Sequence, residues 1–286
     1  MCCLFGFHDY GHNLTRKQRT ILLKTLAIAC EERGTDATGI AYNENGIQHI
    51  YKRPLAAHKM WFRVPQESTV VMGHTRMATQ GCEKQNQNNH PFRGKVKGRS
   101  FALAHNGVLN NERYLRQKYR LPATQIETDS YIAVQLLEHF GTLDFPGLQH
   151  MAEQLEGTFT FTMLSDKDEL YFVKGNNPMY ILHFRKLGLY LYASTEQILR
   201  AALRQLPFSL GAFEPIQLYS GDILCIDAQG KLSRSSFDTN NIDYSYTWLW
   251  PATERIYSHS LSDSFEGDRD YLEDLKAVAP CFGLSG

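Results

Sequence analysis

The chain has 286 residues, in which 30 lysines and arginines are matched by 30 aspartates and glutamates. This balance, without a long block of like charge, argues against nucleic acid or another polyanion as a partner. The first residues lack a basic region followed by an apolar stretch, and no run of about eighteen apolar residues occurs. The sequence therefore predicts a cytoplasmic protein that neither is secreted nor binds or spans a membrane.

The six cysteines are too sparse and irregular for a disulfide scaffold, so we expect reduced thiols. Cysteines and histidines with metal-ligand spacing are absent, and so are the glycine-rich motifs that bind phosphates. The sequence therefore predicts neither a metal site nor a cofactor.

The first half of the chain predicts buried strands and two helices. The apolar segment Cys2–Phe7 is typical of a short strand, and apolar residues at helical spacing predict a helix over Arg16–Glu32. A second helix is expected from Asp129 to Phe140, capped by Thr128 or Asp129. Further interior strands, each ending in polar residues, are expected at Gly39–Tyr42, Thr69–Met72 and Phe101–His105.

The second half is rich in strands, with one helix expected at Glu196–Leu206. Apolar and polar residues alternate with the period of two that is typical of half-buried strands. The expected strands are Thr158–Met163, Leu170–Val173, Tyr180–Phe184, Leu189–Tyr192, Ile216–Tyr219 and Ile223–Ile226. Grouped strands and helices, rather than strict alternation, predict an α+β domain with antiparallel sheets over residues 2–240.

Residues 241–286 carry little periodicity and are interpreted as a C-terminal tail or docking segment. Tyr246, Trp248 and Trp250 alternate within it, which is consistent with an added edge strand or with a surface that binds a partner.

Cys2 is the first residue with a direct chemical implication. Removal of the initiator methionine would leave a thiol and a free α-amine on one residue. An α-amine has a reference pKa about 2.5 units below that of lysine, so part of it is unprotonated near neutrality. It can accept the thiol proton, as N-terminal amines do for other hydroxyl and thiol nucleophiles.

Four further motifs follow Cys2 in a fixed order. They are Arg33-Gly34-Thr35-Asp36-Ala37-Thr38-Gly39, His74-Thr75-Arg76-Met77-Ala78-Thr79, Asn106-Gly107 and Thr128-Asp129. Over about residues 2–205 this series resembles the class II glutamine amidotransferases, specifically the stand-alone glutaminase-domain type. The resemblance implies the N-terminal nucleophile hydrolase fold, a four-layer α/β/β/α sandwich of two antiparallel sheets, with residues 2–240 as its glutamine amidotransferase domain.

The resemblance also implies an oxyanion hole. Attack of a thiolate on an amide carbonyl generates an oxyanion that needs preorganised donors. The Asn106 side-chain amide and the Gly107 backbone N–H match those donors in the family. Without the surrounding motifs, an Asn-Gly pair would be interpreted as a hairpin turn.

By the same resemblance, Arg76 holds the α-carboxylate of glutamine with its planar guanidinium and Asp129 pairs with the α-ammonium. Thr79 is expected to hydrogen-bond the carboxylate end of the bound glutamine. The alternatives are a surface ion pair for Arg76 and a helix N-cap for Asp129. Arg33 and Asp36 are expected to brace the loop around the N-terminus.

The histidines in and beside these motifs are not expected to be bases, because the resemblance implies no histidine base. We expect His74, His90 and His105 to be buried and hydrogen-bonded, and Glu127 to be a solvated neighbour.

Three positions depart from the family pattern. Cys3 stands where many members have glycine, and Met77 and Gln80 replace the tryptophan and histidine of the Arg-Trp-Ala-Thr-His segment in glucosamine-6-phosphate synthase. These replacements bear on how the loop closes over glutamine.

The biosynthetic members of the family pass ammonia to a synthase domain of several hundred residues, and no segment of that length follows residue 206. A partner subunit could supply the ammonia acceptor, or hydrolysis itself could be the output. The leading hypothesis is hydrolysis of L-glutamine with release of ammonia. The alternatives are a γ-glutamyl-peptide amidohydrolase and a non-catalytic glutamine-binding subunit.

Overall fold

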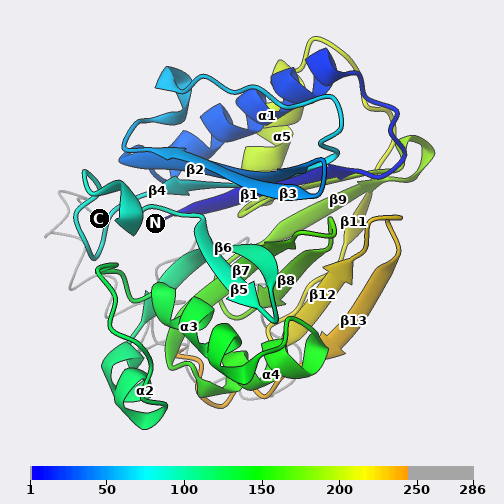
Figure 1. Ribbon diagram of the computed structural model, residues 1–286. Helices are drawn as coiled ribbons and strands as arrows, with labels where there is room; N and C mark the ends of the chain where they lie inside the picture. The colour runs from blue at the N-terminus through cyan, green and yellow to red at the C-terminus, as the bar shows by residue number, and fades with distance from the viewer. Residues whose placement is uncertain (1, 244–286) are drawn as a thin grey trace, which may run out of the picture. The chain divides into compact units, whose positions relative to one another are not determined.

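The computed structural model describes residues 2–243. Two antiparallel sheets pack face to face, with helices on the outer side of each (Figure 1). This is the four-layer arrangement that the sequence predicts. The segment interpreted as a tail lies outside the described residues from position 244 onward. This part includes Tyr246, Trp248 and Trp250. The domain boundary at residue 240 therefore stays a prediction.

The first sheet has seven strands in the order β11-β9-β10-β1-β4-β2-β3. Its strands are β1 (Cys3–Asp9), β2 (Ala37–Glu44), β3 (Ile47–Arg53), β4 (Val70–Arg76), β9 (Tyr180–Phe184), β10 (Leu189–Ala193) and β11 (Glu214–Ile216). Strand β1 pairs with β10 on one side and β4 on the other, so the strand that follows Cys2 lies in the interior of the sheet.

The second sheet has six strands in the order β13-β12-β8-β7-β6-β5. Its strands are β5 (Phe92–Val96), β6 (Arg99–Leu109), β7 (Gly157–Ser165), β8 (Leu170–Lys174), β12 (Asp222–Ile226) and β13 (Leu232–Ser236). Strand β6 carries Asn106 and Gly107 near its end and pairs with β7.

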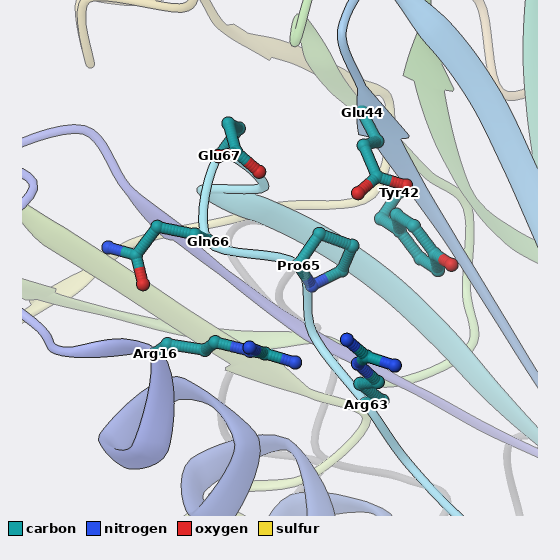
Figure 2. Close-up of a pocket in the computed structure, with 7 residues that line it drawn as sticks. All are labelled: Arg16, Tyr42, Glu44, Arg63, Pro65, Gln66 and Glu67. Carbon is teal, nitrogen blue, oxygen red and sulfur yellow. The ribbon is translucent and has the colours of Figure 1, made fainter.

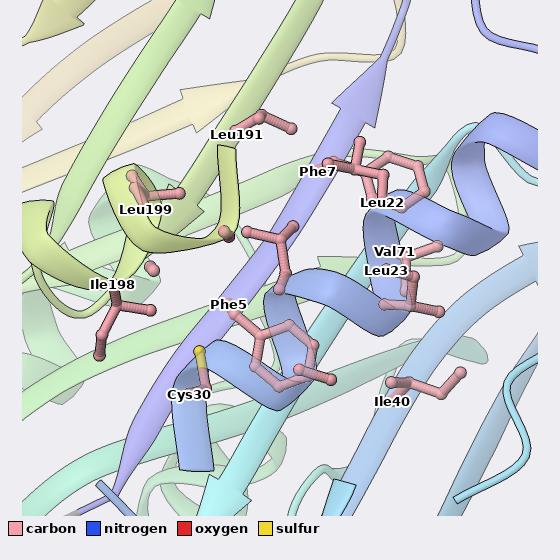
Figure 3. Close-up of a cluster of buried hydrophobic side chains, with 14 of the residues drawn as sticks. Phe5, Phe7, Leu22, Leu23, Cys30, Ile40, Val71, Leu191, Ile198 and Leu199 are labelled. Carbon is pink, nitrogen blue, oxygen red and sulfur yellow. The ribbon is translucent and has the colours of Figure 1, made fainter. Parts of the chain in front are cut away.

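Helices α1 (Arg16–Ala29) and α5 (Glu196–Gln205) cover the outer face of the first sheet. Figure 3 shows this layer, in which Leu22, Leu199 and their neighbours pack on Phe5 and Phe7 of β1. Burying one such side chain fully contributes about 1.5–3 kcal/mol. Helix α1 starts at a capping box in which the Thr15 hydroxyl accepts from the Gln18 backbone N–H.

Helices α2 (Glu112–Lys118), α3 (Tyr131–Phe140) and α4 (Phe145–Gln154) contribute to the core on the outer side of the second sheet. A third core lies between the two sheets and includes Leu4, Met72 and Ala104. Because successive side chains of a strand point to opposite faces, each strand divides its residues between this inner core and a helix-covered outer core. That division decides which polar side chains face the space between the sheets.

Most of the predicted elements are confirmed, and three predictions are wrong in detail. The first helix is regular only to Ala29 and ends in a 3-10 turn over Cys30–Glu32. Residues 217–219 lie outside β11, so the strand expected at Ile216–Tyr219 is confirmed only at Ile216. The second helix begins at Tyr131 with Ser130 at the N-cap, and neither Thr128 nor Asp129 occupies that position.

Among residues 2–243, the structure contains no helix with the length and apolar character needed to cross a membrane.

Candidate functional site

Cys2 lies immediately before the interior strand β1. Its carbonyl accepts a hydrogen bond from Arg33 Nε, 3.0 Å away, and its thiol lies 3.5 Å from the Met77 carbonyl oxygen. Cys3 pairs with Thr75 in β4, which brings Cys2 next to Arg76 at the end of that strand. Leu4 packs in the inner core, whereas Cys3 packs under α1. Alternation therefore places Cys2 on the side that faces the second sheet.

The thiol of Cys2 is not activated by its surroundings alone. Burial raises the pKa of the Cys2 thiol, and the backbone hydrogen bond with Met77 and the positive charges of Arg76 and Arg33 offset only part of this effect. A thiol with a raised pKa is protonated near neutrality, so attack by its sulfur requires a nearby base.

Arg76 is buried and hydrogen-bonded, which excludes the surface ion pair considered from the sequence. Its Nη1 donates to Asn89 Oδ1 over 2.7 Å, and its Nη2 donates to the carbonyls of Gln80 and Gly81. Burial lowers the pKa of the guanidinium, while Cys2 when ionised, and the charges of Glu83, Asp36 and Asp129, act in the opposite direction. Arg76 thus lies within electrostatic range of Cys2 and Asp129.

Arg33, Gly34 and Asp36 pack around the backbone that follows Arg76. Asp36 Oδ2 accepts from the Ala78 N–H over 2.7 Å, and the Asp36 N–H donates to the Arg76 carbonyl over 3.0 Å. A Cβ on Gly34 would come within 2.6 Å of the Arg76 carbonyl oxygen. Only glycine allows this close approach, so the Arg-Gly-x-Asp segment and the Arg76 segment fit together as a unit.

Asn106 and Gly107 lie within β6 and do not form a hairpin turn. Asn106 is two residues beyond Ala104 of the inner core, and its side chain is only 1% exposed. Its Nδ2 has no hydrogen-bond partner among the described residues. A buried donor of this kind costs about 1–3 kcal/mol when it is left unpaired, so its presence calls for an explanation such as a bound ligand or water.

Gly107 has a φ of +149°, in the range that favours glycine. A Cβ at this position would come within 2.0 Å of the Thr158 carbonyl oxygen. The backbone that carries the predicted second oxyanion donor therefore requires glycine.

Asp129 is 5% exposed and is not the N-cap of α3. Its Oδ2 instead accepts from the backbone N–H of Leu109 over 2.6 Å, and its Oδ1 accepts from the Ser130 hydroxyl over 3.3 Å. The carboxylate accepts its hydrogen bond from Leu109 of β6, two residues after Gly107. It is therefore not available to cap the helix. This contact holds Asp129 next to the Asn-Gly segment.

Thr79, Met77 and Gln80 belong to the exposed loop after β4, and the Met77 side chain is 49% exposed. Glu127 is exposed, as expected, and its Oε2 also accepts from Asn88 Nδ2 over 2.8 Å.

The three motif histidines are buried, as the sequence predicts. His74 Nε2 donates to the His105 carbonyl over 3.0 Å, and His105 Nδ1 lies 2.8 Å from the Ser130 hydroxyl. His90 stacks near His74, but neither of its ring nitrogens has a hydrogen-bond partner among the described residues, contrary to expectation. Burial lowers the pKa of all three, and that of His74 falls to about 3.

Sequence reasoning assigned no role to Asn89, Lys52 or Asn177. Asn89 holds Arg76, and Lys52 Nζ donates to the carbonyls of Asn89 and Pro91. Burial, followed by the charge of Arg76, lowers the pKa of Lys52 to about 8. Asn177 Nδ2 donates to the Asn106 carbonyl over 2.8 Å. Asn89 directly precedes His90, one of the histidines considered from the sequence, whereas nothing local marks Lys52 or Asn177.

A surface pocket of about 480 Å³ lies away from these residues. Its lining includes Tyr42 and Glu44 at the far end of β2 from Arg76, and Figure 2 shows Arg16 and Arg63 on either side of the space below Pro65. The two arginines are balanced there by Glu44 and Glu67, so the pocket carries no dominant charge. Within residues 2–243, no cluster of three or more histidine, cysteine or acidic side chains is arranged to hold a metal.

Comparison with solved structures supports the fold. Glutamine phosphoribosylpyrophosphate amidotransferase from B. subtilis superposes with a TM-score of 0.65 over 84% of this chain and 51% of that chain, at 19% identity. A structure described as the allosteric regulatory enzyme of purine biosynthesis gives a TM-score of 0.64 at the same identity, over 84% of this chain and 50% of that one. The two-sheet sandwich is thus the N-terminal nucleophile hydrolase fold that the resemblance implied.

Sequence comparison identifies longer relatives. Glutamine–fructose-6-phosphate aminotransferase (isomerizing) of Halalkalibacterium halodurans is 34% identical over 190 residues, which are 63% of this chain and 30% of that protein. The enzyme of the same name from Geobacillus kaustophilus is 32% identical over the same extent. The chain therefore matches only about a third of the length of these relatives.

The sequence model described as "Glutamine amidotransferases class-II" matches residues 29–215. The match covers more than half of the chain and includes Arg33, Arg76, Asn106 and Asp129, although it begins after Cys2. The chain belongs to the class II glutamine amidotransferases.

Proposed function

We propose that this protein hydrolyses the side-chain amide of L-glutamine, with Cys2 as the nucleophile, and releases ammonia. The observation that carries the proposal is the buried, unpaired Nδ2 of Asn106. Asn106 faces the space between the sheets from β6, and Cys2 and Arg76 border the same space from the first sheet. An unpaired donor that faces the same space as a thiol can stabilise an oxyanion during acyl transfer.

The first step is attack by the Cys2 sulfur on the γ-carbonyl carbon of glutamine. Removal of Met1 frees the α-amine of Cys2, which takes the thiol proton. Burial disfavours the thiolate, so the amine is the group that takes up the proton. The Arg33 contact with the Cys2 carbonyl orients the residue while its nitrogen and sulfur take part in the reaction.

The tetrahedral oxyanion then accepts hydrogen bonds from Asn106 Nδ2 and from the Gly107 N–H. Collapse of this intermediate breaks the C–N bond, and ammonia leaves with the proton that the α-amine returns. The product on the enzyme is a γ-glutamyl thioester, and water hydrolyses it to glutamate and the free thiol.

Arg76 and Asp129 select the amino-acid head group of glutamine. Arg76 Nη2 would exchange the carbonyls of Gln80 and Gly81 for the α-carboxylate, and Thr79 in the same loop would contact that carboxylate. Asp129 would receive the α-ammonium while it keeps its contact with the Leu109 N–H. Recognition of both charges aligns the distal amide with the sulfur.

The fate of the ammonia is a separate proposal. The relatives named above are aminotransferases much longer than the matched segment, which supports an ammonia-accepting synthase partner for this chain. In the absence of such a partner, hydrolysis is the output. We also retain as a proposal the cytoplasmic location, in which the described cysteines would stay reduced.

Intact-mass measurement with a γ-electrophilic glutamine analogue tests the nucleophile. We expect loss of Met1, followed by one adduct on the peptide that starts at Cys2. An unmodified first peptide after complete removal of Met1 would contradict the mechanism.

Assays with glutamine and with γ-glutamyl dipeptides test the substrate. We expect ammonia release from glutamine and rejection of the bulkier dipeptides. Faster cleavage of the dipeptides would instead identify a γ-glutamyl-peptide amidohydrolase. Glutamine binding with no turnover of either substrate would identify a non-catalytic subunit.

A further inference from the structure

Asn177 contacts the backbone at the predicted oxyanion hole from a distant part of the chain. It lies between β8 and β9, is 3% exposed, and donates from Nδ2 to the Asn106 carbonyl over 2.8 Å. Its own backbone is also anchored, because its N–H donates to the Phe159 carbonyl over 3.4 Å and its carbonyl accepts from the Thr160 hydroxyl over 2.6 Å. Strand β7 thus holds the backbone of Asn177, from which the side-chain amide reaches Asn106.

This contact controls the direction of a second group. The Asn106 carbonyl and the Gly107 N–H belong to one planar peptide unit and point in opposite directions. A donor that holds the carbonyl therefore also sets the direction of the N–H. A hydrogen bond to the carbonyl further polarises the peptide and strengthens its N–H as a donor.

Gly107 and Asn177 are also fitted to each other. A Cβ on Gly107 would lie 2.6 Å from Asn177 Nδ2. The glycine therefore both permits the local φ of +149° and leaves the space that the Asn177 amide occupies.

We propose that Asn177 is a positioning residue for glutamine hydrolysis, which aims the Gly107 N–H at the oxyanion by holding the Asn106 carbonyl. The inference rests on the proposed function of Cys2, Asn106 and Gly107. Asn177 itself does not touch the substrate, so its loss affects the transition state more than the binding of glutamine.

The test compares Asn177→Ala with Asn177→Asp and with a matched control, Asn176→Ala. Asp has nearly the size of Asn but places a carboxylate oxygen against the Asn106 carbonyl. Asn176 is buried in the same turn, and its Oδ1 accepts from the Phe159 N–H over 3.1 Å. Its side chain hydrogen-bonds to Phe159 and Asp243 and to no residue of the 105–107 segment.

We expect both Asn177 variants to lower kcat by about 10- to 100-fold and to leave KM for glutamine within about twofold. The Asn176→Ala variant should keep both parameters near those of the wild type. Calorimetry in a Cys2→Ala background should give the same glutamine affinity with and without Asn177→Ala. Thermal unfolding of each variant reports whether it is folded.

Equal kcat for Asn177→Asp and the wild type would overturn the inference, and so would equal losses in Asn177→Ala and Asn176→Ala. A wild-type protein without turnover of glutamine would overturn the proposed function, and the inference with it. An active wild type with unaffected Asn177 variants would overturn the inference alone.

Discussion

His74 on β4 donates a hydrogen bond from Nε2 to the carbonyl of His105 on β6, 3.0 Å away. The bond joins the two sheets one residue before Asn106. Asn177 holds the next carbonyl, that of Asn106 itself. Both peptide units that flank Asn106 are therefore fixed by buried side chains, which prepares the local backbone before any substrate arrives.

Cys2→Ala should abolish turnover, with kcat lowered by about 10⁴-fold or more, because no other group replaces the sulfur. Glutamine binding should persist. Cys3→Ala is the matched control, since the Cys3 thiol lies in the core under α1, 3.0 Å from Cys30 Sγ. Steady-state assays of ammonia release distinguish the two variants, and comparable losses in both would contradict the assignment of Cys2.

Asn106→Ala should lower kcat by about 10²- to 10³-fold with little change in KM, because it removes one oxyanion donor. The unpaired Nδ2 makes no hydrogen bond with the described residues that the substitution would break. The melting temperature should therefore stay near that of the wild type. A change confined to KM would show that Asn106 contacts the ground state instead.

Asp129→Asn should raise KM for glutamine by about tenfold or more, equivalent to ~1.4 kcal/mol, because it removes the charge that pairs with the α-ammonium. The amide oxygen can still accept from the Leu109 N–H, so the fold should be retained. Glu127→Gln, in the same segment but exposed, is the control and should leave KM unchanged. Equal effects of the two substitutions on KM would contradict the assignment of Asp129 to the glutamine-binding site.

Gly107→Ala should destabilise the protein by about 3 kcal/mol or more, through backbone strain and the clash with the Thr158 carbonyl. Gly46→Ala is the control for strain alone, because Gly46 also has a positive φ of +74° but has open space around it. Urea denaturation measures both changes. Equal losses of stability in the two variants would contradict a clash with the Thr158 carbonyl at position 107.

Stability should fall in acid as the pH drops from about 6.5 towards 4. Burial lowers the pKa of His8 to about 4 and that of His74 to about 3. Both histidines bind protons near pH 6.5 when the chain is unfolded, so over this interval the unfolded state binds more protons than the folded state. Each contributes a loss of up to about 1.4 kcal/mol per pH unit.

The variant His8→Leu tests this explanation. It removes one titrating group whose ring nitrogens form no hydrogen bond of good geometry among the described residues, although the Ala228 backbone interacts with the ring. The free energy of unfolding, measured by denaturation between pH 4 and 7, should therefore depend less steeply on pH. An unchanged slope would mean that other groups dominate acid unfolding.

The strongly patterned elements could be predicted from the sequence. The alternation in Thr158–Met163 and the apolar face of the first helix both identify their elements correctly. Strand β3 was missed because its pattern is mostly polar and half-buried, and β5 because glycine and charged residues interrupt it. The start of α3 was misplaced because a local cap rule could not anticipate that Asp129 contacts Leu109, 20 residues away.

The site shows the same division between local and distant information. Residues within contiguous motifs, such as Arg76 and Asn106, could be proposed from their neighbours in the chain. Asn177 could not, since its partner Asn106 is 71 residues away and only the pairing of β6, β7 and β8 brings the two together. Lys52 likewise acts on Asn89, 37 residues further along.

The interior position of β1 has a mechanical consequence. A strand bonded along both edges cannot shift along its axis without breaking both ladders at once. Cys2 immediately precedes this strand, so its backbone is attached to a segment that cannot slide between its two neighbours. For the proposed nucleophile, we therefore expect changes in turnover to come from the segments around Cys2 rather than from a movement of β1.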